Sequence, residues 1–322
     1  MKFACIALLV SALLGSFGSF AAAEEAYPAR PIQIVVPYAP SGGTDFVARE
    51  LANGLSEKFG QQVIVANRPG AATILGTEVV AKSRPDGYTL LMTSFPLAAN
   101  PSLYAKLPYD AAHDLAPISL ITNAPTVLVV NPKLPAADVK ALVAYCRERP
   151  GEISYASYGA GSGAYLAAAL FESVTGIRLL HVPYAGGGPA ARAVMAGETQ
   201  LLFSSALPVL GNIKAGQIKV LAVAAPARIA ALPGVPTFRE AGVDYETGTW
   251  FGLLAPARTP APIIAKLYDG VAATLAAPAL RAQLAGQGAD VVGSPPAAFA
   301  GFLHEETERW AAVIARAGIA KQ

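Results

Sequence analysis

The chain has few of the residues that build disulfides, metal centres and strongly charged surfaces. It contains two cysteines and three histidines in 322 residues, and 14% of its residues are charged. Cys5 lies in the N-terminal apolar run and is expected to leave with it, so Cys146 has no intrachain disulfide partner. We interpret Cys146 as a small buried hydrophobe rather than a nucleophile. His113, His181 and His304 are far apart and fit no metal-ligand spacing, so no metal is expected.

The chain also lacks an excess of either charge. It has 24 basic and 22 acidic residues, and removal of Lys2 with the leader leaves 24 − 1 = 23 basic residues. No basic patch is present, which argues against a nucleic-acid partner. The apolar share of 53% predicts a large core, and roughly 300 residues suit two domains of ordinary size.

The N-terminus has the three parts of a secretory signal peptide. A positive residue, Lys2, precedes an apolar run from Phe3 to Leu14, and small residues end at Ala21-Ala22-Ala23. We therefore expect residues 1–23 to be a signal peptide cleaved near Ala23, and the product to be exported to the periplasm. No cysteine follows the apolar run, so no lipid anchor is expected at this junction.

One stretch near the mature N-terminus predicts an anion-binding turn. Ile32 to Val36 is an apolar, β-branched run typical of a buried strand, and Gly42-Gly43 follows it. Thr44 or Asp45 is the expected helix cap. Apolar residues then recur every four positions, at Val47, Leu51, Leu55 and Phe59. A strand, a glycine turn and a free helix N-terminus direct unpaired N–H groups at one spot, which suits a carboxylate or a phosphate.

The remaining chain continues this alternation and predicts an α/β fold. The first three strands and two helices follow a β-α-β-α-β pattern, as in a parallel sheet flanked by helices. Leu115–Val130 is a long extended stretch with Pro125 near its middle, a candidate crossover between domains. A second α/β series follows it. We expect one lobe from residues 24–123 plus 226–322, a second lobe from 124–225, a hinge of two strands, and a ligand in the cleft between the lobes.

Two further sequence features bear on the fold. Val36-Pro37-Tyr38-Ala39 is repeated as Val182-Pro183-Tyr184-Ala185, as two lobes of similar build would show. The last helical stretch, 296–316, has an aromatic and aliphatic stripe that we interpret as core: Phe299, Phe302, Leu303, Trp310, Val313 and Ile314.

A second glycine loop, Gly159 to Gly163, follows a predicted strand at Glu152–Ser157. It fits a loose dinucleotide fingerprint, but the next strand ends at Tyr184 without the required carboxylate, so no nucleotide cofactor is expected. Ser162 either caps the next helix, with its hydroxyl and nearby N–H groups holding a ligand, or serves as the nucleophile of an exported serine hydrolase. The flanking Ala160 and Ala164 depart from the nucleophile-elbow pattern, which favours the cap.

The candidate ligand-binding residues gather at predicted strand ends and turns. Asp45 is either a plain helix cap or a carboxylate facing the ligand, and Ser204 and Ser205 are either core hydroxyls or ligand contacts. Tyr38, Phe95, Tyr158 and Tyr165 suggest an amphipathic cleft. The full set is Tyr38, Ser41, Gly42, Gly43, Thr44, Asp45, Ser94, Phe95, Ser157, Tyr158, Gly159, Gly161, Ser162, Gly163, Tyr165, Tyr184 and Ser204.

Several motifs, in order along nearly all of the mature chain, resemble the Bug family of periplasmic receptors, also described as TctC-like receptors of tripartite tricarboxylate transporters. The motifs are Tyr27-Pro28-x-Arg30-Pro31-Ile32, the run from Val35 to Asp45, Asn67-Arg68-Pro69-Gly70-Ala71, Pro85-Asp86-Gly87-Tyr88-Thr89-Leu90, Leu107-Pro108-Tyr109-Asp110, His181-Val182-Pro183-Tyr184, Leu232-Pro233-x-Val235-Pro236-Thr237-Phe238 and Trp250-Phe251-Gly252-Leu253.

This resemblance implies a two-lobed periplasmic-binding-protein fold of type II-like form, each lobe a mainly parallel sheet flanked by helices. It implies a receptor without catalytic activity that holds a small carboxylate on the backbone N–H groups and waters of two loops, here Pro40–Asp45 and Ser157–Gly163. The sequence departs from the family at Tyr165, Ala185, Ala193 and Ser204, where His, Lys or Asp is common. These departures favour a larger, partly apolar or aromatic carboxylate over a small di- or tricarboxylate or an amino acid.

The expected partners are the carboxylate ligand and the membrane permease subunits of a tripartite transporter. A receptor that reports to a sensor kinase of a two-component system is the alternative of the same class, and the exported serine hydrolase is the alternative from another class. A monomer is expected.

Overall fold

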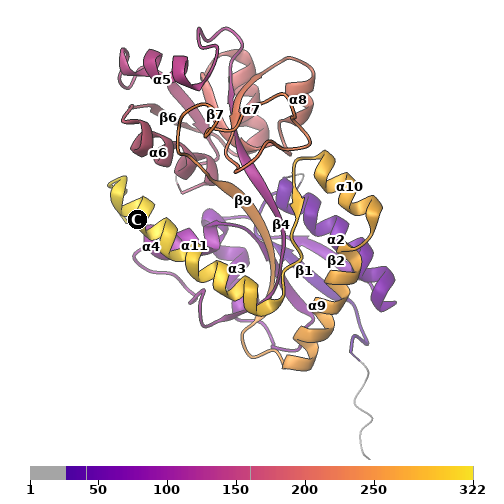
Figure 1. Cartoon of the computed structure of the whole chain (residues 1–322). Helices are drawn as coiled ribbons and strands as arrows, with labels where there is room; N and C mark the ends of the chain where they lie inside the picture. Colours follow the sequence, from indigo (N-terminus) through magenta and orange to yellow (C-terminus); the bar gives the residue numbers. More distant parts are fainter. Residues whose placement is uncertain (1–26, 41, 160, 322) are drawn as a thin grey trace, which may run out of the picture.

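The computed structural model describes residues 27–40, 42–159 and 161–321, which form two halves joined by two long strands (Figure 1). The long strands are β4 (Leu115–Val130) and β9 (Gly248–Pro256). The first half also contains β1 (Ile32–Val36), β2 (Val63–Asn67), β3 (Thr89–Thr93) and β10 (Asp290–Val291). The second half contains β5 (Ser154–Ser157), β6 (Leu180–Pro183), β7 (Leu201–Ser205) and β8 (Lys219–Val223).

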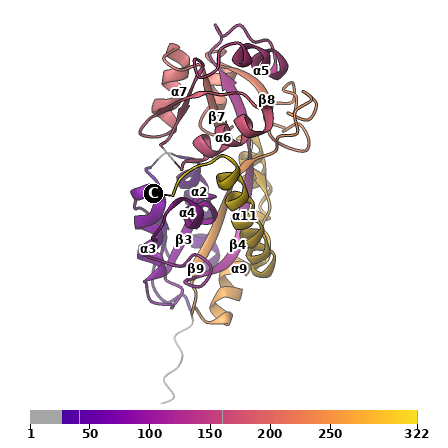
Figure 2. The ribbon, with the colours of Figure 1, turned by 90° about the vertical axis from the view of Figure 1, so that its left-hand side faces the viewer.

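Helices lie on both sides of the strands in each half (Figures 1 and 2). The first half has α2 (Gly43–Phe59), the short η1 (Ala71–Thr73), α3 (Ile74–Ala81), α4 (Pro96–Leu103), α9 (Ala261–Leu275), α10 (Pro278–Gly286) and α11 (Pro296–Arg316). The second half has α5 (Val139–Arg147), α6 (Gly163–Thr175), α7 (Gly187–Ala196) and α8 (Leu210–Lys214). The predicted α/β class is confirmed.

The strand order is β2-β1-β3-β9-β4-β7-β5-β6, with β8 and β10 paired to β4 outside this path. Followed from either end, this order gives the same succession of parallel and antiparallel strand pairs. β1 lies between two parallel neighbours, β2 and β3, and β5 lies between two parallel neighbours, β6 and β7. The long strands β4 and β9 are antiparallel to each other and to β7 and β3 respectively. Position in the sheet therefore makes β5 the counterpart of β1.

The topology shows where the two copies of the Val-Pro-Tyr-Ala sequence lie in the sheet. The first copy begins at Val36, the last residue of β1, but the second begins in β6, whose counterpart in the first half is β2. The two copies therefore occupy different positions in the two halves. Four residues that end a strand and enter a turn are too local to specify which strands become neighbours.

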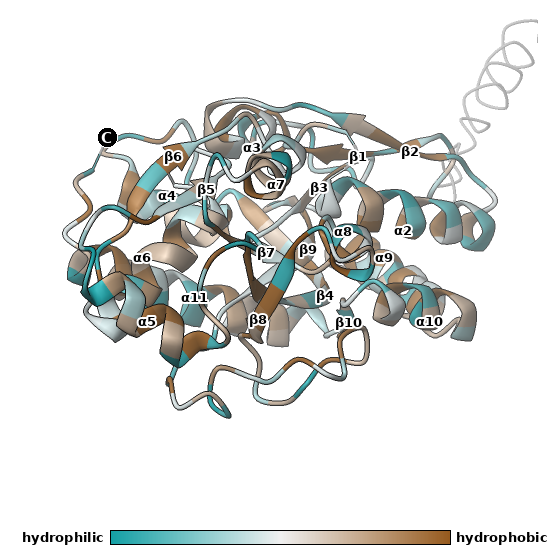
Figure 3. Cartoon of the chain, turned by 90° about the horizontal axis from the view of Figure 1, so that it is seen from above, coloured by the Kyte–Doolittle hydropathy of each residue, from teal (hydrophilic) through white to brown (hydrophobic). Residues whose placement is uncertain are grey.

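The alternation of side chains along the strands explains how both faces of each half are filled. Ile32, Ile34 and Val36 pack on α2 and α9, while Val35 points to the opposite face with α3, α4 and α11. Figure 3 shows hydrophilic and hydrophobic stretches alternating along α2, as expected for a helix with one face on a core. In the second half, α5 and α6 pack on one face and α7 and α8 on the other.

The aromatic stripe of the last helix is core, as predicted. Phe299, Trp310 and Ile314 are buried, and Phe302, Leu303 and Val313 pack against the same cluster. The indole N–H groups of Trp250 in β9 and Trp310 in α11 both donate to the buried Glu306 carboxylate at 3.0 Å. Satisfying three buried polar groups in this way fixes α11 against β9.

The connection between β8 and β9 packs on the second half. Phe238 and Tyr245 in this connection are buried in one cluster with Phe171 and Phe203, and the Phe238 and Tyr245 ring centroids are 4.5 Å apart. Because residues 226–247 contribute to this core, we propose that the chain returns to the first half at β9, after Thr247, rather than at Pro226. The two-lobe division itself remains our proposal.

Among the described residues, no single helix has the length and apolar character needed to cross a membrane, while the bent pair α9 and α10 meets that test only jointly. Their residues Leu267, Val271, Leu275 and Leu284 pack into the first-half core.

Candidate functional site

The first glycine loop connects β1 to α2 and leaves helix N–H groups free of a side-chain cap. The helix begins at Gly43, and its N-cap is Gly42 in an extended conformation, with φ −87° and ψ 171°. The prediction that Thr44 or Asp45 is the cap was wrong, because the cap is Gly42, two residues before Thr44, and both residues lie buried in the first turn. The Phe46 N–H donates to the Gly42 carbonyl at 3.0 Å, so the N–H groups of Gly43 and Thr44 precede the first helical hydrogen bond. Ser41 lies outside the described residues.

Asp45 holds this loop in place. Its carboxylate is 4% exposed and accepts hydrogen bonds from Arg49 Nε and Nη2, both at 3.0 Å, and from Asn67 Nδ2 at 2.9 Å. Asn67, the last residue of β2, also donates to the Tyr38 carbonyl at 3.1 Å. The buried carboxylate therefore ties the first turn of α2 to the neighbouring strand, and Arg49 balances its charge.

The second glycine loop connects β5 to α6 and resembles the first in its position. The Ser162 Oγ accepts the Tyr165 N–H at 3.3 Å and is the N-cap of α6, which confirms the predicted cap. The same oxygen accepts the Tyr158 N–H at 3.3 Å. Gly159 and Gly161 have φ of +111° and +77°, which a side chain would strain.

Tyrosine and serine hydroxyls pair at equivalent places in the two halves. Tyr38 Oη, after β1, lies 2.6 Å from Ser94 Oγ, after β3. Tyr158 Oη, after β5, donates to Ser204 Oγ in β7 at 2.7 Å. Burial raises the pKa of Tyr158 to about 12 and also raises the pKa of Tyr38. Both phenols are therefore neutral hydrogen-bonding groups at pH 7.

The second glycine loop meets the first half of the molecule. A Cβ built on Gly163 would lie 2.8 Å from Phe95 Cε1, and one on Gly161 would lie 3.1 Å from Leu103. Leu166 of α6 is buried in the first-half cluster that contains Phe95. Ser94, Phe95 and the second loop therefore lie at the junction of the halves.

The first loop also reaches the opposite half. A Cβ on Gly43 would lie 3.2 Å from Phe251 in β9 and 3.6 Å from Leu207, which follows β7. The structure thus brings both loops to the junction, where the carboxyl ends of β1 and β5 lie.

Tyr184 faces elsewhere in its own half, while Tyr165 packs on core clusters of both halves. The Tyr165 ring lies 4.8 Å from the His181 ring, and Tyr184 packs on the cluster that contains α7 and α8. Sequence analysis also missed Asn67 and His181 as loop neighbours. His181 Nε2 lies 2.6 Å from Ser157 Oγ, so the imidazole at this loop contacts Ser157 and not Ser162, the nucleophile considered above. Asn67 ends β2, a position that could have suggested a role, whereas His181 is the second residue of β6.

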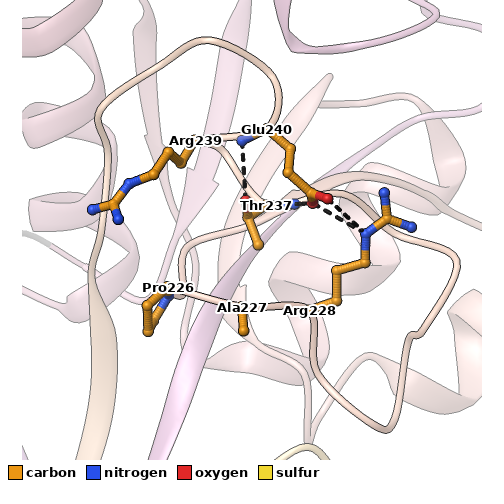
Figure 4. Close-up of a pocket in the computed structure, with 6 residues that line it drawn as sticks. All are labelled: Pro226, Ala227, Arg228, Thr237, Arg239 and Glu240. Carbon is orange, nitrogen blue, oxygen red and sulfur yellow. Dashed lines mark hydrogen bonds and ion pairs between the residues drawn. The ribbon is translucent and has the colours of Figure 1, made fainter.

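The cavities described in the structure lie away from both glycine loops. One of about 350 Å³ lies beside the β8–β9 connection (Figure 4), and another of about 270 Å³ is lined partly by His113 and Asp114. In the first, Arg228 Nε lies 3.1 Å from both Glu240 carboxylate oxygens, while the Glu240 N–H donates to Thr237 Oγ1 at 3.1 Å. Arg228 and Glu240 are therefore paired with each other, and their contacts stabilise this surface turn. Within the described parts of the chain, no group of three His, Cys, Asp or Glu side chains could hold a metal.

Solved structures similar to this chain are periplasmic binding proteins. An R. palustris protein solved with adipate is 35% identical, with a TM-score of 0.87, over 92% of this chain and 100% of that one. MatC of Rhodopseudomonas palustris, solved with bound malate, is 32% identical, with a TM-score of 0.83, over 89% of this chain and 100% of that one. The periplasmic binding protein BugD gives 32% identity and a TM-score of 0.85, over 92% of this chain and 100% of that one.

Sequence comparisons agree with this fold. The protein BugT of Bordetella pertussis is 38% identical over 297 residues, which cover 91% of each chain. The family model for the tripartite tricarboxylate transporter family receptor, TctC, matches residues 47–319. Members of this family are periplasmic solute-binding receptors rather than enzymes. This chain therefore belongs to the tripartite tricarboxylate transporter receptor family, TctC.

Proposed function

We propose that this protein is a periplasmic receptor that holds the carboxylate of its ligand between the two glycine loops and delivers the ligand to a membrane permease. The main support is the equivalent placement of the loops after β1 and β5, at the junction of the halves. Each loop precedes a helix N-terminus, where unpaired N–H groups and the helix dipole favour an anion. Movement of the halves about β4 and β9 would close them on the ligand.

The polar groups of the site favour a ligand with one carboxylate and a largely apolar body. Among the predicted site residues only Asp45 is charged, and it is paired with Arg49. A second carboxylate would then have hydroxyl pairs and N–H groups but no site cation opposite it, and burying an unpaired charge is costly. Ala185, Ala193 and Ser204, where the family resemblance implies Lys or Asp, are uncharged. We therefore favour a larger, partly apolar or aromatic carboxylate over citrate.

Titration calorimetry tests this ligand class. Benzoate and 4-hydroxybenzoate should bind more tightly than citrate, with adipate and malate as comparisons because similar proteins were solved with them. Tight binding of citrate alone would contradict the proposal. Native mass spectrometry of freshly purified protein would identify a ligand that co-purifies.

The cellular role is also a proposal. We infer that residues 1–23 are removed in export, that the mature protein is a monomer, and that it supplies a permease rather than a sensor kinase. N-terminal sequencing of exported protein should begin at Glu24, and light scattering should give the monomer mass. Deleting the gene should abolish uptake of the ligand. Loss of ligand-induced transcription with normal uptake would favour the sensor role instead.

A further inference from the structure

A buried serine at the end of β5 holds the loop that follows this strand through hydrogen bonds. Ser157 is the last residue of β5 and is fully buried. Its Oγ accepts the Gly159 N–H at 3.0 Å and donates to the Gly159 carbonyl at 3.3 Å. Gly159 has a φ of +111°, so the loop turns sharply at the residue that Ser157 holds. The Gly159 carbonyl also accepts the Ser162 N–H at 3.1 Å, which links this brace to the cap of α6.

His181 of the neighbouring strand contacts both sides of this loop. β6 runs parallel to β5, with Tyr155 opposite His181 in the register. The imidazole stacks on Tyr155, with centroids 5.1 Å apart, and contacts Tyr165 of α6 at 4.8 Å. Its Nε2 lies 2.6 Å from Ser157 Oγ. One side chain therefore fixes the strand that enters the loop and the helix that leaves it.

The other partners of the Ser157 hydroxyl bear on which imidazole nitrogen carries the proton. The Ser157 hydroxyl has one hydrogen, and its contact with the Gly159 carbonyl uses that hydrogen. With the hydrogen on that carbonyl contact, the short contact to His181 is a bond from Nε2–H to Ser157 Oγ, and this is the arrangement that we adopt. If Nε2 were instead the acceptor, the Gly159 carbonyl would lose the serine as a donor.

The first half has a brace of the same kind. There the edge strand β2 provides Asn67, which donates to the Tyr38 carbonyl and to Asp45 in the loop after β1. β2 and β6 hold equivalent places in the strand order. Each ligand loop is thus held by a side chain from the edge strand beside it.

We infer that His181 is a positioning residue for ligand binding: through Nε2–H and Ser157 it holds the second glycine loop in its anion-binding conformation without touching the ligand. This inference rests on the proposed function only for its effect on affinity. Its effect on the loop is independent of any ligand. The two effects therefore give separate readouts.

The first experiment needs no ligand. Hydrogen exchange at the Gly159 amide should become about tenfold faster in His181→Phe, which keeps a ring between the tyrosines but removes the donor. His181→Asn, which keeps a donor, should restore slow exchange, and His304→Phe, at an exposed histidine elsewhere, should leave it unchanged. Nitrogen-15 shifts of the His181 ring should show the proton on Nε2. Ser157→Ala removes the acceptor of the Gly159 N–H itself and gives the exchange rate expected when the whole brace is absent.

The second experiment measures affinity for benzoate and adipate by calorimetry. His181→Phe and Ser157→Ala should weaken binding by about tenfold, and His181→Asn should recover most of it. Unchanged Gly159 exchange in His181→Phe, or equal effects of the Phe and Asn variants, would overturn the inference. If the unaltered protein binds neither probe nor the other panel acids, the proposed function fails, while the exchange measurement still decides the role of His181.

Discussion

Replacing Gly163 by alanine should separate ligand affinity from stability. Gly163 is the first residue of α6, and a Cβ added there would lie 2.8 Å from Phe95 Cε1 in the opposite half. That is about 0.7 Å short of the roughly 3.5 Å at which carbon atoms make favourable contact. Phe95 is 5% exposed and its ring lies 5.7 Å from that of Trp310, so it has little room to move away. The substitution keeps the Gly163 N–H, so any loss of binding arises from the added methyl group.

The magnitude follows from two opposing effects. Overpacking of a well-packed contact typically costs about 1–3 kcal/mol. Alanine in place of glycine in a helix instead stabilises by about 0.5–1 kcal/mol. In the closure proposed above, the free protein relieves this contact by separating its halves, so we assign the cost to the ligand-bound form. Affinity should therefore fall by about 5- to 150-fold, while the melting temperature without ligand should stay the same or rise.

Calorimetry with the acid panel and thermal unfolding without ligand measure the two quantities. Gly187→Ala is the matched control, because Gly187 also begins a helix in the second half and its added Cβ would meet only the Tyr158 ring at 3.6 Å. Combining Gly163→Ala with Phe95→Leu should recover part of the affinity. Wild-type affinity in Gly163→Ala would refute the idea that the halves close on each other at this contact.

Three further measurements test the electrostatic account. Burial lowers the pKa of His181 below 6.5 in the folded protein, so the unfolded chain takes up this proton first. The free energy of unfolding should therefore fall as the pH drops below 6.5. Urea melts at pH 7 and pH 5 should show a smaller fall for His181→Asn than for the unaltered protein. Asp45→Asn replaces a buried, hydrogen-bonded carboxylate with a neutral amide and should lower the free energy of unfolding by about 1–3 kcal/mol. Arg49→Met, at the half-exposed partner, should lower it by less. Equal effects of the two substitutions would show that Asp45 does not hold the loop in place. Burial raises the pKa of the Cys146 thiol to about 11, so a thiol reagent should react with the mature protein only after denaturant is added, and rapid reaction of the native protein would contradict its burial.

The hydroxyl pairs place the same chemistry in both halves of the site. Tyr38 with Ser94 and Tyr158 with Ser204 join neighbouring parallel strands at corresponding positions. A ligand held between them would meet neutral donors and acceptors on both sides, with the helix N-termini supplying the positive potential. This symmetry is the structural basis for expecting specificity through shape and neutral polar contacts rather than through ion pairs.

The sequence by itself determined the local elements. The β-branched run ended in a strand at Ile32–Val36, and the apolar residues spaced by four ended in one face of α2, because these periods follow from the geometry of a strand and a helix. It also predicted that Ser162 caps α6 and that the aromatic stripe of α11 lies in the core. The family could be inferred from motifs along the chain, since each motif is local.

The tertiary structure decided which of these local elements are neighbours. Strand order alone makes β5 the counterpart of β1, joins Tyr38 to Ser94 across 56 positions, and brings Asn67 and His181 beneath the two loops. It also gave Asp45 an ion pair in place of the expected cap, because the helix starts at Gly43, after the cap Gly42, and the carboxylate turns towards β2. Such contacts depend on long-range strand pairing, and no short window of sequence carries the information that selects one pairing over another.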